Sequence, residues 1–220
     1  MISILCPSRG RPELAKNMID TAIATSSVPL EFLLYLNEDD PELSKYKELI
    51  DSNHYSIGPD RSTGYSWNLL AESAKYDILF LMGDDADFVT AGWDTKIIEA
   101  FSLYPDKIAC VYPITGVVSK KKNPHFCIHK SWVTVVGYFV PPHFWHYYVD
   151  TWVGEIARRL NRYHCLRDVT VSIQKHVNDA TEKRIGDNCK IERDRYIWEK
   201  TQRHLSADEE LLRNYIRNYR

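Results

Sequence analysis

The sequence predicts an α/β protein in which a mixed, mostly parallel sheet lies between two layers of helices. Two observations support this fold class. Short apolar runs alternate with amphipathic helical segments along the first hundred residues. The strongest run, Asp77–Met82, is continuously apolar after its first residue, as expected for a central strand that is covered on both faces. A composition of 44% hydrophobic and 26% charged residues fits a folded globular protein.

Apolar spacing and two prolines define the first strand and helix. Ile2–Cys6 is a short apolar run that ends at Pro7, which is typical of a buried strand. Pro12 suits the first position of a helix, because its missing N–H is not needed there. Apolar residues at helical spacing then predict a helix over 12–25.

The same criteria define the remaining elements. In the first half we expect a strand at Glu31–Leu36, a helix at Glu42–Asp51, a strand at Tyr55–Gly58 and a helix at Thr63–Lys75. In the second half we expect a helix at Trp93–Leu103, a strand at Lys107–Pro113, one or two strands within Phe126–Val140, a helix at Phe144–Asn161 and a strand at Val169–Ile173. The pair Ser206 and Glu209 has the spacing of a capping box, which predicts the start of a last helix.

Length and cysteine usage limit the class of protein. A chain of 220 residues suits one large domain. No apolar run reaches the roughly 18 residues that span a membrane. The five cysteines form no Cys-x-x-Cys pair, so neither a disulfide framework nor a zinc site is expected. We therefore expect a soluble cytoplasmic protein, monomeric or homodimeric, that does not engage a membrane.

The formal net charge of -2 conceals an uneven distribution. Residues 1–150 carry 13 lysines and arginines against 19 aspartates and glutamates, whereas residues 151–220 carry 15 against 11. The basic C-terminal third could contact a polyanion such as DNA, or its arginines could form solvated helix faces. Charge alone leaves both interpretations open.

Polar loops follow three of the predicted strands, at 7–12, 37–40 and 83–87. In an open α/β sheet these loops meet at the carboxyl edge, where ligands bind. Asp84, Asp85 and Asp87 lie in the third loop, and crowded carboxylates are stabilised by a hard cation such as Mg²⁺ or Mn²⁺. The alternative is an acidic turn that caps the following helix.

The order and spacing of these motifs resemble a known family. The motif PSRGRP at 7–12, an acidic end to the second strand, GYSWNLLA at 64–71 and LFLMGDD at 79–85 are together similar to family 2 glycosyltransferases with the GT-A fold. The resemblance covers 1–100, and more loosely 130–180. It implies transfer of a sugar from a nucleoside-diphosphate sugar, a UDP-sugar first of all, to an acceptor hydroxyl with the help of Mn²⁺ or Mg²⁺.

The resemblance also implies an organisation of the chain. Residues 1–104 would form the nucleotide-sugar half of a single domain, 105–180 its acceptor-binding and catalytic half, and 181–220 a helical extension. The residues that it places around the nucleotide sugar are Pro7, Ser8, Arg9, Arg11, Glu38, Asp39, Asn68 and Asp84. Among these, Glu38 or Asp39 would read the nucleobase, and an arginine would pair with a phosphate, because a guanidinium matches phosphate oxygens in a bidentate manner.

The metal ligands are also implied by the resemblance. The Asp-x-Asp element of the family would fall on 83–85 or on 85–87, with Asp84 and Asp85 as the preferred pair and Asp87 as the alternative. The family usually has an aspartate directly after the apolar strand, where Met82 and Gly83 stand here. His176 follows the last predicted strand and would add an imidazole ligand, which favours Mn²⁺.

Inverting glycosyl transfer needs a carboxylate base for the acceptor hydroxyl. Similar enzymes place that base at the start of a helix in the second half, and Asp150 matches this position; the alternative is that it only caps the helix. Trp145, Trp152 and Tyr138 would stack on the sugar or the acceptor; the alternative for the segment Tyr138–Trp145 is simple core packing, the default for aromatic residues. The histidines at 125, 129, 143, 146 and 164 show no metal-ligand spacing, so aromatic packing or acceptor contacts are their expected roles.

Two other functions remain possible from the sequence. One is a non-catalytic module of the same fold that binds a nucleotide sugar or a nucleic acid; the other is a transferase that glycosylates modified bases in DNA. A nucleotidyltransferase is disfavoured, because the loop at 8–11 is poor in the glycine that a phosphate-binding loop needs.

Overall fold

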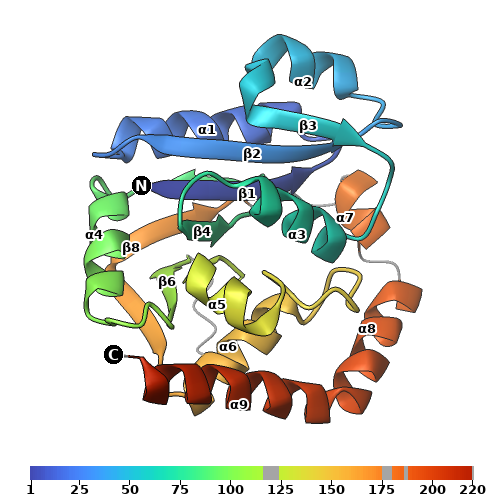
Figure 1. The fold of residues 1–220 in the computed structure, drawn as a ribbon. Helices are drawn as coiled ribbons and strands as arrows, with labels where there is room; N and C mark the ends of the chain where they lie inside the picture. Colours follow the sequence, from blue (N-terminus) through green and yellow to red (C-terminus); the bar gives the residue numbers. More distant parts are fainter. Residues whose placement is uncertain (116–123, 175–179, 186–187, 220) are drawn as a thin grey trace.

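The computed structural model describes residues 1–115, 124–174, 180–185 and 188–219. In this part of the chain eight strands form a sheet in the order β3-β2-β1-β4-β7-β6-β8-β5. Helices cover both faces of the sheet (Figure 1). The α/β class and the mixed sheet predicted from the sequence are therefore confirmed.

The elements have the following bounds. The strands are β1 (Ile2–Ser8), β2 (Leu30–Asn37), β3 (Tyr55–Gly58), β4 (Ile78–Leu81), β5 (Ala86–Phe88), β6 (Cys110–Ile114), β7 (Phe126–His129) and β8 (Tyr163–Ile173). The helices are α1 (Pro12–Thr25), α2 (Leu43–Leu49), the 3-10 turn η1 (Ser52–His54), α3 (Thr63–Ser73), α4 (Trp93–Ser102), α5 (Lys130–Val136), α6 (Val149–Arg159), α7 (Ala180–Ile185), α8 (Asn188–Lys200) and α9 (Gln202–Asn218).

The order of the parallel strands reverses beside β1. From β1 the chain adds β2 and then β3 toward one edge, and β4 next pairs with the other side of β1. β7 continues the sheet antiparallel to β4. The loops that leave the carboxyl ends of β1 and β4 consequently diverge, which opens a crevice of the kind in which α/β proteins bind ligands.

Two apolar cores hold the helices against the sheet. The alternation of side chains along β1 divides them, because Ile2 and Ile4 face the core under α1, α2 and α4, whereas Leu5 faces the core under α3, α5, α6 and α9. Leu205 and Leu212 of α9 are fully buried in the second core. The C-terminal helix is therefore packed into the body of the protein. Within the described residues no helix is long and apolar enough to cross a bilayer.

Most predicted elements are confirmed, and the segment Phe126–Val140 contains one strand, within the expected one or two, together with a helix that was not predicted. Only β7 is extended, and α5 follows it directly. The ring of His129 caps α5 by accepting a hydrogen bond from the N–H of Ser131 (3.1 Å), and Trp132 is buried at 1% exposure. Packing of this tryptophan overrides the strand preference of the β-branched residues around it.

Two helix starts also differ from the prediction. The helix expected from Phe144 begins only at Val149, since the backbone before it is engaged by another side chain, described below. The last helix begins at Gln202 instead of at the predicted capping box. Ser206 lies inside it and donates from its hydroxyl to the carbonyl of Gln202 (3.3 Å).

Candidate active site

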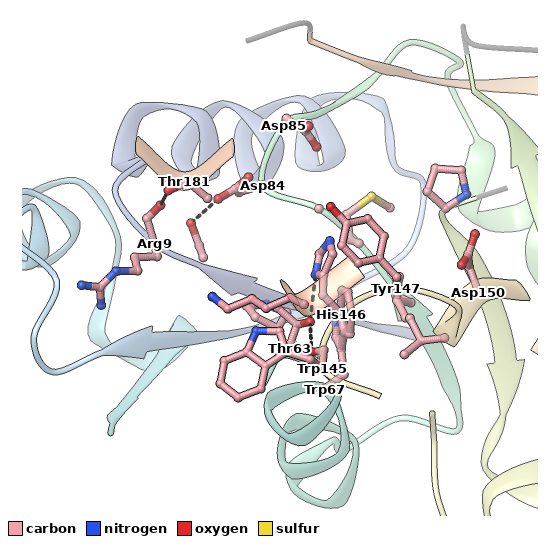
Figure 2. A pocket seen from close by; sticks show the side chains of 18 of the residues that line it. Arg9, Thr63, Trp67, Asp84, Asp85, Trp145, His146, Tyr147, Asp150 and Thr181 are labelled. Carbon is pink, nitrogen blue, oxygen red and sulfur yellow. Dashed lines mark hydrogen bonds between the residues drawn. The ribbon is translucent and has the colours of Figure 1, made fainter. Parts of the chain in front are cut away.

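A cavity of about 590 Å³ opens at the carboxyl edge of β1 and β4 (Figure 2). Its walls come from distant parts of the sequence: the loop after β1, the loop after β4, the segment 145–151 before and within α6, and side chains of α7 and α8. The cavity therefore lies in the crevice that the reversal of strand order creates.

Asp84 is the buried acid of this cavity, with 6% exposure. Its carboxylate accepts a hydrogen bond from the hydroxyl of Ser8 (2.6 Å) and forms an ion pair with Arg11 (3.2 Å). Burial raises the pKa of Asp84 to about 6, although Arg11 and Ser8 act in the opposite direction. Arg11 and Ser8 thus offset only part of the cost of burying the negative charge of Asp84.

Tyr46 fixes the orientation of these groups. The hydroxyl of Ser8 has a single hydrogen and donates it to Asp84, so the phenol of Tyr46, 2.6 Å away, donates to Ser8. The phenol oxygen in turn accepts from the backbone N–H of Arg11 (2.9 Å). This chain of hydrogen bonds joins the loop after β1 to the loop after β4.

His125 supports the second of these loops. It is 3% exposed, lines the cavity, and accepts a hydrogen bond at Nε2 from the backbone N–H of Gly83 (3.2 Å). Burial lowers the pKa of His125 to about 4, so the ring is neutral and can accept this bond. This hydrogen bond thereby fixes the position of the backbone that leads to Asp84 and Asp85.

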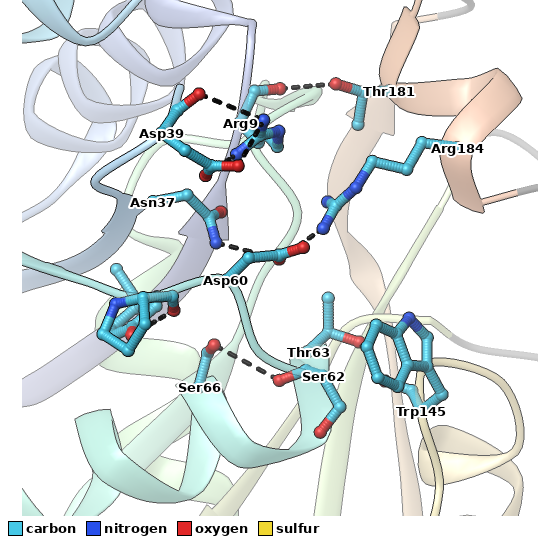
Figure 3. Close-up of polar contacts among 12 residues, drawn as sticks. Arg9, Asn37, Asp39, Asp60, Ser62, Thr63, Ser66, Trp145, Thr181 and Arg184 are labelled. Atoms are coloured by element: carbon cyan, nitrogen blue, oxygen red, sulfur yellow. Dashed lines mark hydrogen bonds and ion pairs between the residues drawn. The ribbon is translucent and has the colours of Figure 1, made fainter. Parts of the chain in front are cut away.

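A second polar network ties α7 to the strand ends (Figure 3). The amide of Asn37 donates to Asp60 (3.0 Å), and Asp60 also forms an ion pair with Arg184 of α7. The hydroxyl of Thr181, also in α7, donates to the backbone carbonyl of Arg9 (2.5 Å). The C-terminal part of the chain consequently closes one side of the cavity.

The opposite wall contains Asp150, which lies in the first turn of α6. Tyr148, the residue before this helix, has a left-handed backbone conformation (φ 69°). The residues before it are held by Asp194 of α8, a side chain with 0% exposure. Its carboxylate accepts hydrogen bonds from the backbone N–H groups of Trp145, His146 and Tyr147 (2.9 Å each for the shortest contact). These bonds take the place of the first helical turn that the sequence predicts here.

The structure gathers more than half of the predicted site residues around the cavity. Those that line it are Pro7, Ser8, Arg9, Arg11, Asp84, Asp85, Trp145 and Asp150. Glu38 and Asp39 do not line it, although Asp39 pairs with Arg9, which lowers the pKa of the Asp39 carboxyl. Asp87 lies on β5 opposite Ser172. His176 lies outside the described residues.

Three further predicted residues serve packing at positions away from the cavity lining. Asn68 accepts at Oδ1 from the N–H of Phe139 (2.8 Å) and donates to the carbonyl of Val140 (2.8 Å), so it braces the chain after α5. Tyr138 and Trp152 both donate to the carboxylate of Asp208 in α9. Trp152 is 1% exposed, so no face of its ring is open to a ligand.

The donor chemistry of Asp84 and Asp85 fits a divalent cation. Both are carboxylates, both line the cavity, and the partly balanced charge of Asp84 favours a nearby positive ion. Within the described residues no cluster of three histidine, cysteine, aspartate or glutamate side chains surrounds such a position. Among the described residues that line this side of the cavity, Asp84 and Asp85 are the carboxylates, and Mg²⁺ or Mn²⁺ with waters and phosphates is the type of ion that carboxylates suit.

Sequence reasoning missed Tyr46, Thr181, Arg184 and Asp194, and it did not foresee that His125 supports the loop after β4. Asp194 lies in the charged segment KIERDRY, which has the pattern of a solvated helix face, and its role depends on a loop almost 50 residues earlier. The other contacts have no local signature.

Comparisons with known proteins give the fold class. No family model matches the chain, and no curated protein is similar to it. Among solved structures, the chain is similar to GT-A-like glycosyltransferases. One is a mannosyltransferase of Pyrobaculum calidifontis in complex with GDP-Man and Mn²⁺ (TM-score 0.67, 11% identity, 96% of this chain and 69% of that one).

Another is S. aureus TarS in complex with UDP (TM-score 0.58, 9% identity, 79% of this chain and 60% of that one), which is also solved with UDP-GlcNAc (TM-score 0.60, 11% identity, 81% and 59%). The chain thus spans about 60% of the length of the TarS fragment. At these identities the similarity concerns the fold alone.

Proposed function

We propose that the protein is a glycosyltransferase that moves a sugar from a nucleoside-diphosphate sugar to an acceptor hydroxyl with inversion. The observation that supports this best is the arrangement of one cavity. A buried carboxylate with an arginine partner, Asp84 with Arg11, lies at the switch point of the sheet, and Asp150 lines the opposite wall. The solved GT-A-like structures with UDP or GDP-sugars agree with it at the level of the fold.

Each wall of the cavity has a separate task in this proposal. Arg11 and Arg9 bind the diphosphate, because guanidinium groups pair well with phosphate oxygens. Asp84 and Asp85 hold a divalent cation, which would offset the charge of the departing diphosphate. Ser8 and Tyr46 keep Asp84 oriented, so the carboxylate does not have to reorganise when the substrate binds.

Asp150 is the proposed general base. The acceptor oxygen forms a bond to the anomeric carbon as the bond from that carbon to the diphosphate breaks, and the nucleoside diphosphate leaves with the electron pair. The acceptor hydroxyl loses its proton to Asp150. Because attack occurs opposite to the leaving group, the configuration of the anomeric carbon inverts. A carboxylate across the cavity from Asp84 suits this geometry.

The test is a panel of UDP- and GDP-sugars with and without Mn²⁺ or Mg²⁺, read by thermal stabilisation and by release of nucleoside diphosphate. A ligand that binds only the native protein raises the melting temperature. We expect Asp84→Asn to lose donor binding and Asp150→Asn to keep binding but lose turnover. Asp168→Asn is the matched control, since its carboxylate pairs with Lys96 away from the cavity lining. Stabilisation by no nucleotide sugar, or full turnover in both variants, would contradict the proposal.

DNA is the second candidate, as a bound partner or as the acceptor. It is favoured by Arg61, Lys190 and Arg195, which line the cavity. Within the described residues Arg61 and Arg195 form no ion pair, and the Lys190 ammonium lies 5.1 Å above the ring of Trp145. Binding of DNA that weakens steeply as salt rises, together with loss of affinity in Arg195→Ala, would support this candidate. Salt-independent or absent binding would exclude it.

A further inference from the structure

The wall between the proposed diphosphate and acceptor ends contains His146, whose ring is fixed by Thr63 at the start of α3 (Figure 2). The hydroxyl of Thr63 lies 2.9 Å from the backbone carbonyl of Trp145 and 2.9 Å from Nδ1 of His146. A carbonyl can only accept, so the single hydroxyl hydrogen of Thr63 points to Trp145. The contact with His146 therefore has Nδ1–H as the donor and the Thr63 oxygen as the acceptor.

This arrangement determines which ring nitrogen remains basic. With its proton on Nδ1, a neutral imidazole presents an unprotonated Nε2 as a hydrogen-bond acceptor. Burial lowers the pKa of His146 to about 4, so the ring is neutral in the physiological range. Within the described residues no donor pairs with Nε2, and His146 lines the cavity.

Neighbouring groups hold the ring in place. It stacks on Trp67 with ring centroids 6.3 Å apart and meets Tyr147 edge-on at 5.0 Å. Its backbone N–H is bound by Asp194 (2.9 Å). Because the ring, the backbone and the tautomer are all constrained, Nε2 is a preorganised acceptor, and little conformational entropy is lost when it accepts a hydrogen bond from a ligand.

The position of His146 indicates what that donor is. In an inverting transfer the sugar lies between the leaving diphosphate and the base, because the attack is in line. Asp84, His146 and Asp150 line the same cavity, and in Figure 2 His146 is drawn between the other two. A hydroxyl of the transferred sugar is the donor group that this part of the cavity would contain.

We propose that Nε2 of His146 accepts a hydrogen bond from a hydroxyl of the transferred sugar, and that this contact helps the protein to distinguish a nucleotide sugar from the bare nucleoside diphosphate. The inference rests on the proposed function and extends it to recognition of the sugar. A site built to bind a hydroxyl discriminates strongly against ligands that lack it.

Two substitutions separate this role from a structural one. Asparagine places its amide near the position of Nδ1, so His146→Asn can keep the bond to Thr63 but removes Nε2. Glutamine reaches the position of Nε2, so His146→Gln keeps an acceptor for the sugar. His164→Asn is the matched control, because His164 contacts the hydroxyl of Tyr104 through Nδ1 (3.0 Å) and does not line the cavity.

The measurement is the dissociation constant, for each variant, of the nucleotide sugar that stabilises the wild type most and of the matching nucleoside diphosphate. We expect His146→Asn to weaken binding of the nucleotide sugar by about tenfold, the effect of one lost hydrogen bond, and to leave nucleoside-diphosphate binding unchanged. His146→Gln should recover much of the difference, and His164→Asn should match the wild type.

Several outcomes would overturn the inference while the proposed function survives. One is that His146→Asn prefers the nucleotide sugar over the nucleoside diphosphate as strongly as the wild type does. Another is that the affinity for both ligands falls equally, which would mean that His146 has a structural role. A nucleotide-sugar affinity that falls in Thr63→Val and returns in Thr63→Ser supports the role of the fixed tautomer. If the wild type binds no nucleotide sugar at all, the proposed function fails and this inference fails with it.

Discussion

The strongest stability prediction concerns Asp194, the buried carboxylate that holds the backbone before α6. In Asp194→Ala the N–H groups of Trp145, His146 and Tyr147 lose their acceptor. Each buried donor left without a partner costs about 1–3 kcal/mol, and water that enters the vacated space recovers part of that. We therefore expect a loss of about 3–5 kcal/mol in the free energy of unfolding, a large part of the 5–15 kcal/mol typical of a domain.

The ion pair of Asp194 contributes much less than these backbone bonds. Arg193 contacts the carboxylate at 2.9 Å, but its side chain is 51% exposed. Exposed pairs contribute about 0–1 kcal/mol, so Arg193→Ala should lower the free energy of unfolding by less than about 1 kcal/mol. Asp194→Asn retains one carbonyl oxygen as an acceptor, and we expect its loss to lie between those of the other two variants.

Urea unfolding of the wild type and the three variants, followed by tryptophan fluorescence, measures these differences. The expected order of stability is wild type, Arg193→Ala, Asp194→Asn, Asp194→Ala. A change below about 1 kcal/mol in Asp194→Ala would refute the reasoning, since it would mean that water replaces the buried carboxylate without cost. Similar losses in Arg193→Ala and Asp194→Ala would assign the effect to the ion pair instead.

Three further predictions follow from the same structure. The folded-state pKa of His146, about 4, lies below its ordinary value of 6.5, so the unfolded chain binds more protons between them and stability falls as pH drops; urea unfolding should show the wild type losing about 2 kcal/mol more than His146→Asn between about pH 8 and about pH 5. A Cβ on Gly64 would lie 3.0 Å from the carbonyl oxygen of Phe144, so Gly64→Ala should lower both stability and donor affinity in the same assays, and unchanged values would show that the loop can move aside. Asp208→Ala should lower the free energy of unfolding by about 1–3 kcal/mol, because the hydrogen bond from Tyr138 is lost, while the KM for the donor stays constant. A selective rise in KM would indicate instead that Tyr138 contributes to substrate binding.

The first half of the fold could be predicted because its information is local. The helix over 12–25 and the strand at 55–58 have the predicted bounds. Apolar spacing, Pro12 at a helix start and polar loops after strands are all properties of short segments. Since parallel strands bring their carboxyl ends to one edge, the same local pattern also placed the loops at 7–12 and 83–87 together.

The second half was harder to predict because distant residues determine it. The backbone of 145–147 is held by a side chain on α8, so its own helical pattern did not decide its conformation. The β-branched run of α5 forms a helix because Trp132 packs into the core there. Trp152 was expected to stack on a ligand, but it is 1% exposed, which shows that tertiary burial decides between core and ligand contacts.

The chemistry of Asp84 shows why a part of the site could still be predicted. With 6% exposure, this side chain has a pKa of about 6 against an ordinary value of 3.8, so its surroundings, burial above all, disfavour the ionised form by a net of about 3 kcal/mol. An asparagine at this position could also accept a hydrogen bond from Ser8, without the cost of a buried charge. A carboxylate that reduces stability, at a sheet edge where ligands bind, is better explained by the ligand than by the fold. The crowding of Asp84 and Asp85 after a buried strand was visible in the sequence, and it is the local pattern on which the proposed cation site rests.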